Sequence, residues 1–579
     1  MCGILGQISS KNIDKNEFES NLLNLIHRGP DDNGIYFENN IALGHTRLSI
    51  LDLSKDGHQP MISDSGNYII IYNGEIYNFK EIKKDLLQKG YKFYSNSDTE
   101  VILNGYMEYK ENIAKYLNGM FAFSIYNKFT KELFLARDKS GIKPLYYFYN
   151  NENFIFSSEI KILKKYSSEI NLDAKILFLL LGYIPEPLTI YDSIYIFPAG
   201  HYGYYKNSKL DIVKYDKYYF EPKIEKPYDA IVSDIKELFH NSIKRHLISD
   251  ASIGTFLSGG LDSSAITAVA AQYKTDLQTL SLVFNEKDLS EEYYQDLVVN
   301  RYATKHTKFL IDENLFLNSI DDFFNSMDQP TIDGLNTYFV SLAARKSGLK
   351  TVLSGVGGDE IFYGYPSFKN GKVLKALSYI PYSFIKMFEY SNKYKKLELL
   401  QIENDLAYYL PKRGLFSPSE IAKILNIDKS TIYNLIIKLW ETYNSSHIND
   451  IEDKISYFEL NMYMKNQLLR DTDLFGMSHS LEIRVPFLDK ELIEYVLKIK
   501  PKNKFGIYNK QILADVSKDI LPKEIYDRKK MGFTLPFEHW FRKNIDKFDI
   551  DNDIKIRFQN KRLQWARFWA IYIIGRFLS

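Results

Sequence analysis

Short apolar runs separated by polar turn residues mark the first third of the chain. Runs rich in β-branched and aromatic residues, at 67–72, 121–126 and 132–136, are bounded by Asn, Gly and Lys. Runs of this length between turn residues are typical of strands. We therefore predict an α+β domain of layered sheets for this part of the chain.

A different pattern begins near residue 228, where helical stretches alternate with apolar runs. It predicts helices over 228–246, 262–273, 291–306 and 337–347, and strands over 253–257, 277–284 and 350–353. Strands that alternate with helices favour an α/β domain, a parallel sheet with helices on both faces. Near the C-terminus, residues 564–577 carry aromatic side chains at close to helical spacing, which predicts a packing helix.

The stretch 206–227 is polar and contains Lys and Pro, so we interpret it as a linker. A chain of 579 residues is too long for a single hydrophobic core. We therefore predict two domains, residues 1–210 and residues 225–579.

Composition narrows the class of protein. With 45% hydrophobic residues, 25% charged residues and a formal net charge of +1, the chain gives no reason to expect nucleic acid or a membrane as a partner. The longest apolar stretches, 176–181 and 569–574, are far shorter than a membrane span, and the first residues lack the features of a signal peptide. We expect a cytoplasmic enzyme that acts on small molecules.

The turn at residues 256–264, FLSGGLDSS, carries the first candidate chemistry. An apolar run leads into it and a helical run of small residues leaves it. Backbone N–H groups at such a strand–turn–helix junction converge on an anion. Serine hydroxyls add donors, and Asp262 can hold a metal ion. The alternative is an ordinary tight turn, since the spacing is neither a Walker A loop nor GxGxxG.

The string Ser-Gly-Gly-Leu-Asp-Ser resembles the pyrophosphate loop of enzymes that cleave ATP to AMP while forming amides. The resemblance implies a HUP-like ATP-pyrophosphatase domain, with Asp262 and Asp359 holding Mg²⁺ on the departing pyrophosphate. It also implies a set of ATP-binding residues, which are Phe256, Ser258, Gly259, Gly260, Leu261, Asp262, Ser263, Leu282, Ser354 and Gly355. For Phe256 and Leu282, a plain role in the strand core is the alternative.

The only cysteine of the chain is Cys2, so no intrachain disulfide and no cysteine-based metal site can form. A lone cysteine is commonly buried filler. If the initiator Met is removed, however, the α-amine of Cys2, which titrates near pH ~8, can act as general base for its own thiol.

The residues that follow Cys2 favour the nucleophile. Cys2-Gly3-Ile4 resembles the start of the N-terminal-nucleophile (Ntn) glutaminase domain of class II glutamine amidotransferases. The match continues through 27–31 (HRGPD), 44–50 (GHTRLSI), 72–78 (YNGEIYN), 97–100 (SDTE), 119–123 (GMFAF) and 137–146 (RDKSGIKPLY). Joined to the pyrophosphate loop, this order resembles the glutamine-hydrolysing asparagine synthetase family over nearly the whole chain.

By this resemblance, Asn73 and the Gly74 backbone N–H stabilise the oxyanion that forms when Cys2 attacks glutamine. Arg47 would bind the α-carboxylate of glutamine, and Glu75 and Asp98 its α-ammonium group. Without the motif, Asn-Gly between apolar runs predicts a hairpin turn, and both interpretations can hold together.

Two positions depart from the family pattern. In 354–360 (SGVGGDE), Val356 stands where familiar asparagine synthetases carry an acidic residue, and Asp473 is followed by Leu474 instead of a basic residue. Either another carboxylate replaces the missing one, or the acceptor is not aspartate, or synthesis is impaired. The late motif 528–533 (RKKMGF) implies a catalytic lysine, Lys530, with Lys529 as its rival.

The predicted enzyme is an ATP-dependent, glutamine-hydrolysing amide ligase. Ammonia released at Cys2 would aminate an aspartyl-adenylate and give asparagine, AMP, pyrophosphate and glutamate. The alternatives are the same chemistry on another carboxylate, such as a uronic acid of surface-polysaccharide biosynthesis, and a scaffold that binds ATP without synthesis. By resemblance, a homodimer is compatible with the sequence, although no stretch marks an interface.

Overall fold

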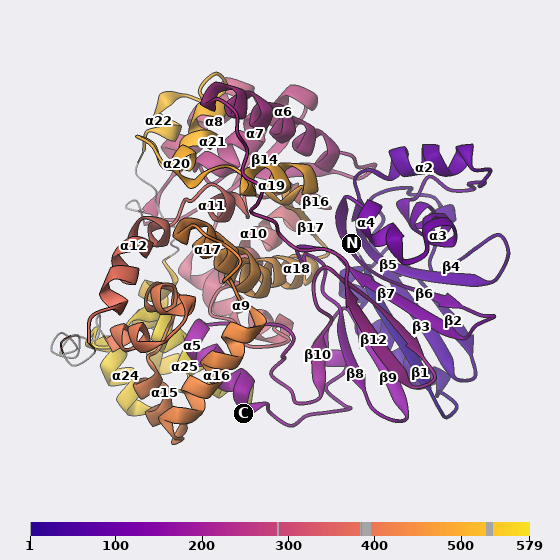
Figure 1. Cartoon of the computed structure of the whole chain (residues 1–579), viewed down its shortest axis with the longest axis horizontal. Coiled ribbons are helices and arrows are strands. Elements are labelled where there is room, and N and C mark those ends of the chain that lie inside the picture. Colours follow the sequence, from indigo (N-terminus) through magenta and orange to yellow (C-terminus); the bar gives the residue numbers. More distant parts are fainter. Residues whose placement is uncertain (1, 287–288, 382–383, 385–394, 529–535, 579) are drawn as a thin grey trace.

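The computed structural model describes residues 2–286, 289–381, 384, 395–528 and 536–578 (Figure 1). Two six-stranded antiparallel sheets form the N-terminal part, and one five-stranded parallel sheet organises the C-terminal part. The predicted fold class, layered sheets followed by a parallel α/β sheet, is therefore confirmed.

The two antiparallel sheets pack face to face. The first has the order β10 (Ile194–Ile196), β8 (Tyr146–Tyr149), β9 (Asn153–Ser157), β1 (Gly3–Ser9), β3 (Ile41–Arg47), β2 (Asp32–Glu38). The second has the order β12 (Lys209–Lys214), β11 (His201–Lys206), β7 (Glu132–Arg137), β6 (Gly119–Asn127), β5 (Tyr68–Ile76), β4 (Met61–Ile62). Ile4 and Leu43 of the first sheet share a buried core with Ile71 and Leu135 of the second.

Helices cover the outer faces of this sandwich. α2 (Phe79–Gln88) and α3 (Asp98–Tyr109) pack on the second sheet, and α1 (Lys15–Leu23) packs on the first. The helices can pack there because apolar side chains of β5 point alternately to the two faces of its sheet. Ile69 and Ile71 face the core between the sheets, whereas Ile70 and Tyr72 face the helices.

The parallel sheet has the order β15 (Lys305–Leu310), β14 (Gln278–Val283), β13 (Ile253–Phe256), β16 (Thr351–Leu353), β17 (Glu482–Arg484). α6 (Tyr228–His246) and α7 (Leu261–Tyr273) share one core with this sheet. α9 (Glu313–Ser326) and α10 (Leu335–Lys346) share another, on the opposite face. The loop at Ser258 thus follows the carboxyl end of the central strand, where α/β sheets bind ligands.

One predicted element is wrong at its end. The helix expected over 291–306 is α8 (Glu292–Tyr302), which stops at Ala303 with φ 48°, and the edge strand β15 follows. Residues Lys305–Leu310 pair in register with β14, so hydrogen bonds of the sheet override the local helical pattern.

A helical lobe completes the C-terminal part. It includes α15 (Pro418–Leu425) and a continuous helical run of α17 (Ile451–Phe458), the π-helix η9 (Glu459–Leu469) and α18 (Arg470–Met477). α5 (Leu172–Leu181), from the first third of the chain, lies against this lobe, where Leu415 N donates to Leu180 O at 2.6 Å. The two parts are therefore packed together.

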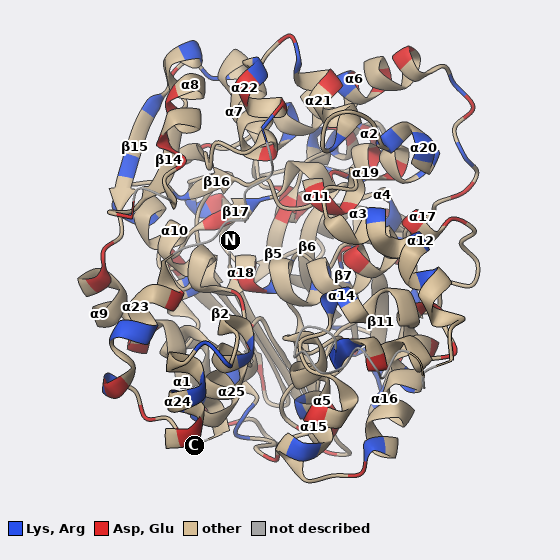
Figure 2. Cartoon of the chain, turned by 90° about the vertical axis from the view of Figure 1, so that its left-hand side faces the viewer, with Lys and Arg blue, Asp and Glu red and all other residues tan. Residues whose placement is uncertain are grey.

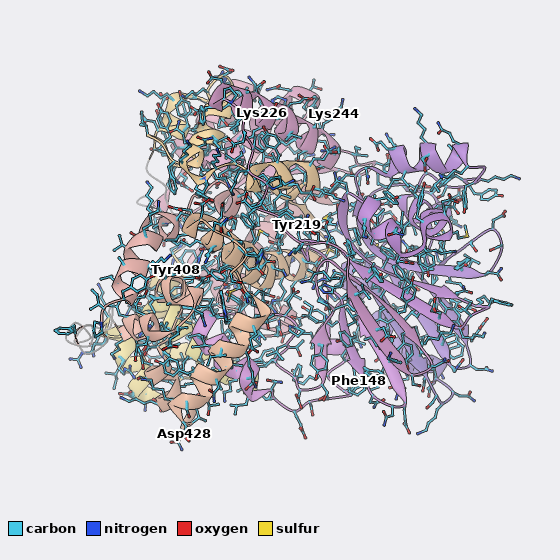
Figure 3. The ribbon with its side chains drawn as sticks, viewed as in Figure 1. Phe148, Tyr219, Lys226, Lys244, Tyr408 and Asp428 are labelled. Atoms are coloured by element: carbon cyan, nitrogen blue, oxygen red, sulfur yellow. The ribbon has the colours of Figure 1, made fainter. Side chains whose placement is uncertain are left out.

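The interpretation of 206–227 as a linker is wrong in its first part, because Lys209–Lys214 form β12, which pairs with β11 at the edge of the second sheet. Tyr219 and Lys226, labelled in Figure 3, lie on the linker between β12 and α6. On the face in Figure 2, acidic and basic residues are interspersed. The predicted C-terminal helix is α25 (Trp565–Leu578).

Within the described ranges, none of the helices has the length and apolar character that crossing a membrane requires.

Candidate active sites

The first site is a pocket beside Cys2. Arg47 at the end of β3, Gly74 and Glu75 on β5, and Asp98 at the start of α3 line this pocket together with Cys2. Its other lining residues are Leu48, Ile50, Leu51, Gly57, Gln59, Tyr72, Ser97 and Thr99. The structure thus gathers four residues predicted to act on glutamine around the predicted nucleophile. Burial raises the pKa of the Cys2 thiol, so a base at the site is needed to form the thiolate.

Asn73 holds Cys2 in place. Its Oδ1 accepts a hydrogen bond from the Cys2 backbone nitrogen at 3.0 Å. Its Nδ2 is buried and has no hydrogen-bond partner among the described residues. A buried donor without a partner is available to an oxyanion that forms beside it. The hairpin interpretation is wrong, because Asn73 and Gly74 lie within β5, paired with Ala122 and Phe121 of β6.

Gly74 leaves no room for a side chain. A Cβ at this position would lie 2.1 Å from the backbone oxygen of Met120. The close approach of β5 and β6 therefore requires glycine here. Gly74 lines the same pocket as Cys2.

Arg47 is fixed by main-chain oxygens. Its Nη1 donates to Ser54 O at 2.8 Å, and its Nη2 donates to the carbonyl of Asp52. Gly57 packs directly on the guanidinium, since a Cβ there would lie 2.1 Å from Nη2. These neutral partners orient the group without neutralising it, which suits it to an incoming carboxylate.

Asp98 and Glu75 place two carboxyl groups in the pocket. Asp98 accepts hydrogen bonds from Tyr72 OH and Ile76 N, both at 2.9 Å. Burial raises the pKa of Asp98 to about 6. Burial also raises the pKa of Glu75, although Arg484 of β17, 3.2 Å away, opposes the shift. A bound ammonium group would favour the charged form of both carboxylates.

The second site is the turn between β13 and α7. Ser258 Oγ lies 2.9 Å from Ser263 Oγ, which also accepts from Ser258 N at 3.1 Å. Gly259 has φ +79°, and a Cβ there would lie 2.9 Å from Tyr294 Cβ. The turn is therefore fixed by its own hydroxyls at the N-terminus of a 13-residue helix, which suits an anion.

Residues far apart in sequence complete this site. Ser258, Gly260, Leu261 and Asp262 line one pocket with Asp359, which lies on α11 (Gly358–Ile361). The same pocket includes Asn509, Lys510, Ile525, Tyr526 and Arg528. The Lys510 Nζ lies 2.7 Å from Asp359 Oδ1 and also bonds the Asp262 carboxylate. Sequence reasoning missed Lys510, because a single lysine before a helix forms no pattern.

The donor set fits magnesium. Mg²⁺ is typically bound by one or two carboxylates together with substrate phosphates and water. Asp262 and Asp359 provide two carboxylates beside the anion-binding turn. In the described part of the chain, no group of three or more His, Cys, Asp or Glu side chains is placed to hold a metal ion. A metal at this site would therefore depend on phosphate oxygens for much of its coordination.

The other predicted nucleotide residues lie in the core or at its edge. Leu282 is buried, and Phe256 packs against the same hydrophobic cluster, as the strand-core alternative expects. Ser354 and Gly355 follow β16, and a Cβ on Gly355 would lie 3.0 Å from Asp262 Cβ. Val356 packs against the cluster on the other face of the sheet.

The late basic motif is described only at its first residue. Arg528 donates from Nη1 to Gly259 O at 3.2 Å and pairs with Glu291. Lys529 and Lys530 lie outside the described residues. The motif therefore begins against the anion-binding turn.

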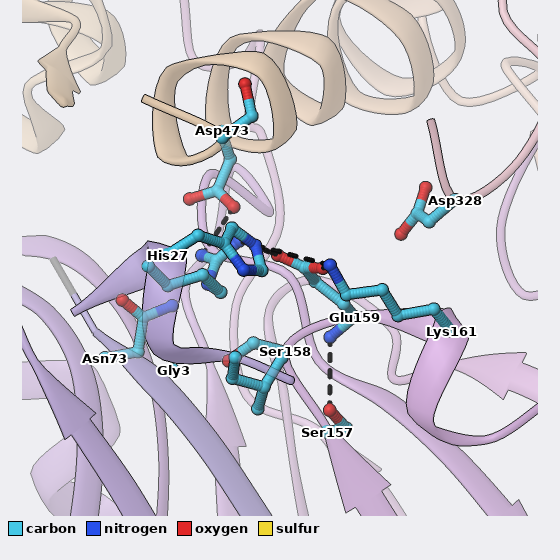
Figure 4. A network of polar contacts seen from close by, with 12 residues as sticks. Gly3, His27, Asn73, Ser157, Ser158, Glu159, Lys161, Asp328 and Asp473 are labelled. Atoms are coloured by element: carbon cyan, nitrogen blue, oxygen red, sulfur yellow. Dashed lines mark hydrogen bonds and ion pairs between the residues drawn. The ribbon is translucent and has the colours of Figure 1, made fainter. Parts of the chain in front are cut away.

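A buried polar network joins the two parts of the chain (Figure 4). Arg28 donates from Nε to Cys2 O at 3.1 Å, from Nη1 to Glu159 at 3.2 Å and from Nη2 to Asp473 at 2.7 Å. Lys143 lies 3.6 Å from the other oxygen of Asp473. The carboxylate whose expected basic neighbour is Leu474 is thus paired with cations of the N-terminal part. Arg28 lies in the matched motif 27–31 and Asp473 was noted for its neighbour Leu474, but the sequence assigned neither residue a role.

These features define the class of protein. A cysteine beside an unsatisfied amide donor and an anion-binding turn with two carboxylates, on separate sheets, are the sites of an ATP-dependent glutamine amidotransferase.

Comparisons with known proteins identify the family. Residues 1–219 match the model of a glutamine amidotransferase domain, and residues 234–553 match the asparagine synthase model. The chain is 32% identical over 568 residues to asparagine synthetase [glutamine-hydrolyzing] 1 of Bacillus subtilis, covering 95% of this chain and 89% of that protein. The chain therefore belongs to the glutamine-hydrolysing asparagine synthetase family, as its sequence predicted, and is an ATP-dependent carbon–nitrogen ligase.

Two further proteins are similar to most of this chain. Asparagine synthetase [glutamine-hydrolyzing] 3 of Bacillus subtilis is 30% identical over 578 residues, covering 95% of this chain and 89% of that protein. Amidase chry2 of Gibberella zeae is 26% identical over 592 residues, covering 90% of this chain and 85% of that protein.

Proposed function

We propose that the protein makes asparagine from aspartate, ATP and glutamine. The observation that carries the proposal is the gathering of sequence-distant residues into two pockets, one at Cys2 and one at Asp262 and Asp359. In this proposal, residues 1–210 form the glutaminase domain and residues 225–579 the synthetase domain.

At the first site, the Cys2 thiolate attacks the side-chain amide carbon of glutamine. The oxyanion that forms accepts hydrogen bonds from Asn73 Nδ2 and the Gly74 N–H, while Arg47 and Asp98 hold the two ends of the amino acid. The thiol proton, taken up by the α-amine of Cys2, passes to the departing nitrogen, so that the tetrahedral intermediate expels ammonia and leaves a thioester. Water then hydrolyses the thioester, which releases glutamate and restores the thiol.

At the second site, a carboxylate oxygen of the acceptor attacks the α-phosphorus of ATP, and pyrophosphate leaves. The Ser258–Ser263 turn binds the phosphates, and Asp262 and Asp359 would hold Mg²⁺. Bound there, the metal ion would neutralise charge on the leaving group. Ammonia then attacks the acyl carbon, AMP leaves, and the nitrogen loses one proton. By family resemblance, Lys530 neutralises the departing pyrophosphate.

A second candidate acceptor is a different carboxylate, such as a uronic acid. Val356 favours it, because valine offers no carboxylate for an amino acid acceptor, and so does Leu474, which is buried and apolar. Product analysis tests the choice. With aspartate, glutamine, ATP and magnesium, we expect one asparagine and one AMP for each glutamate. AMP release that needs a uronic acid nucleotide and is absent with aspartate would instead support the second acceptor.

A further inference from the structure

Lys510 lies between the two carboxylates at which the proposed function places a metal ion. Its Nζ is 2.7 Å from Asp359 Oδ1 and bonds Asp262 Oδ2, and its side chain is only 4% exposed. The ammonium group of Lys510 thus forms an ion pair with both carboxylates in a buried position.

The backbone is arranged to bring this lysine to the carboxylates. Lys510 has φ 55° and ψ 56°, the left-handed region that a residue with a Cβ rarely adopts, and it directly precedes α21 (Gln511–Ser517). Because the local backbone preference disfavours this conformation, tertiary contacts of Lys510 hold it in place.

Two glycines leave room for the three charged groups. A Cβ on Gly364 would lie 1.9 Å from Asp359 Oδ1 and 2.4 Å from Lys510 Cε. A Cβ on Gly358 would lie 2.5 Å from Asp262 Oδ1. The surrounding chain therefore fits Asp262, Lys510 and Asp359 as a packed unit.

We infer that Lys510 is an internal cation that takes the place of Mg²⁺ between Asp262 and Asp359 until nucleotide binds. Two like-charged carboxylates at close range repel each other unless a cation lies between them. A divalent ion that approaches the protein alone has to compete with Lys510 for both oxygens. ATP phosphates offer the ammonium group new acceptors, so metal and nucleotide enter together. This inference rests on the proposed assignment of Asp262 and Asp359 as metal ligands.

The test measures metal binding and needs no turnover. Mn²⁺, a paramagnetic substitute for Mg²⁺, is titrated into the full-length protein without nucleotide, and free Mn²⁺ is followed by electron paramagnetic resonance. Lys510→Met removes the charge and keeps the length of the side chain. Lys510→Gln removes the charge and keeps a hydrogen-bond donor, so it serves if the methionine variant folds poorly. Lys518→Met is the matched control, because Lys518 pairs with Asp515 outside the pocket.

We expect both Lys510 variants to bind Mn²⁺ at least tenfold more tightly than the unchanged protein and the Lys518→Met control. Mn²⁺ alone should also raise the melting temperature of the Lys510 variants more than that of the control, because ligand binding stabilises the folded state. Equal affinity in all four proteins would overturn the role of Lys510.

A separate arm tests the metal assignment itself. Asp262→Asn, measured with ATP present, should lose the Mn²⁺ that binds with the nucleotide. If this variant retains Mn²⁺ in full, the assignment of Asp262 as a ligand is wrong and the inference fails with it. The two failures are thus distinguishable.

Discussion

Arg28 and Asp473 form an ion pair that joins the two parts of the chain. The Arg28 Nη2 lies 2.7 Å from the Asp473 Oδ2, and both side chains are buried. The same guanidinium donates to the main-chain oxygen of Cys2. The position of the proposed nucleophile is therefore linked to α18 through one side chain.

Arg28→Lys tests whether this link couples the two reactions. Lysine keeps the charge, but it lacks the planar fork that bonds Cys2 O, Glu159 and Asp473 at once. We expect a lower rate of glutamine hydrolysis and more than one glutamate formed for each AMP, measured by product ratios. The exposed Arg301→Lys is the control. If Arg28→Lys keeps both the rate and the ratio of the unchanged protein, the link does not couple the sites.

Asn73→Ala tests the oxyanion role. Loss of one preorganised donor typically lowers kcat by about 100- to 1,000-fold. We expect this loss in glutamine-dependent AMP release, while ammonium chloride supports AMP release at an undiminished rate. Equal losses with glutamine and ammonia would show that Asn73 stabilises the fold and not the reaction.

The pH dependence of glutamine binding tests Asp98. Its pKa of about 6 means that the carboxylate is charged above that pH and becomes neutral as the pH falls through it. A neutral carboxyl attracts an ammonium group weakly, so we expect the KM for glutamine to rise between pH 7 and pH 5. In Asp98→Asn, the KM should be high at every pH. The exposed Asp85→Asn should behave like the unchanged protein, and a pH-dependent KM in Asp98→Asn would exclude this role.

Gly364→Ala tests the packing around Asp359 and Lys510. The added methyl group would lie within 2.4 Å of both side chains, so one of them has to move. We expect ATP cleavage to fall at least tenfold, while glutamine hydrolysis stays within about twofold. Gly575→Ala is the control, because nothing lies within 4 Å of its Cβ position. Full ATP cleavage in Gly364→Ala would show that the site tolerates the shift.

Much of the fold was predictable from the sequence because the spacing of apolar and polar residues within each element determines whether it is a helix or a strand. The spacing of apolar residues predicted a helix over 228–246. In the structure, the apolar residues Ile231, Ile235 and Phe239 form the buried face of α6. β15 escaped prediction, since its edge position depends on pairing with β14. The Asn-Gly pair misled for the same reason, because pairing with β6 holds it in a strand.

The candidate sites divide in the same way. Residues in contiguous motifs, such as Ser258 and Asp262, were identified from the sequence. Lys510 and Arg28 were not, because each acts through partners more than a hundred residues away, Asp262 and Asp473 respectively. Pairs formed only by tertiary packing leave no local signal.

An oxygen-transfer experiment tests the central claim, the formation of an acyl-adenylate, most directly. Aspartate labelled with ¹⁸O in its β-carboxylate is incubated with the protein, ATP, magnesium and glutamine, and the nucleotide products are analysed by mass spectrometry. The account predicts AMP that carries one ¹⁸O atom, because an acceptor oxygen stays on the α-phosphorus when ammonia displaces AMP. Unlabelled AMP, or ADP in place of AMP, would contradict it.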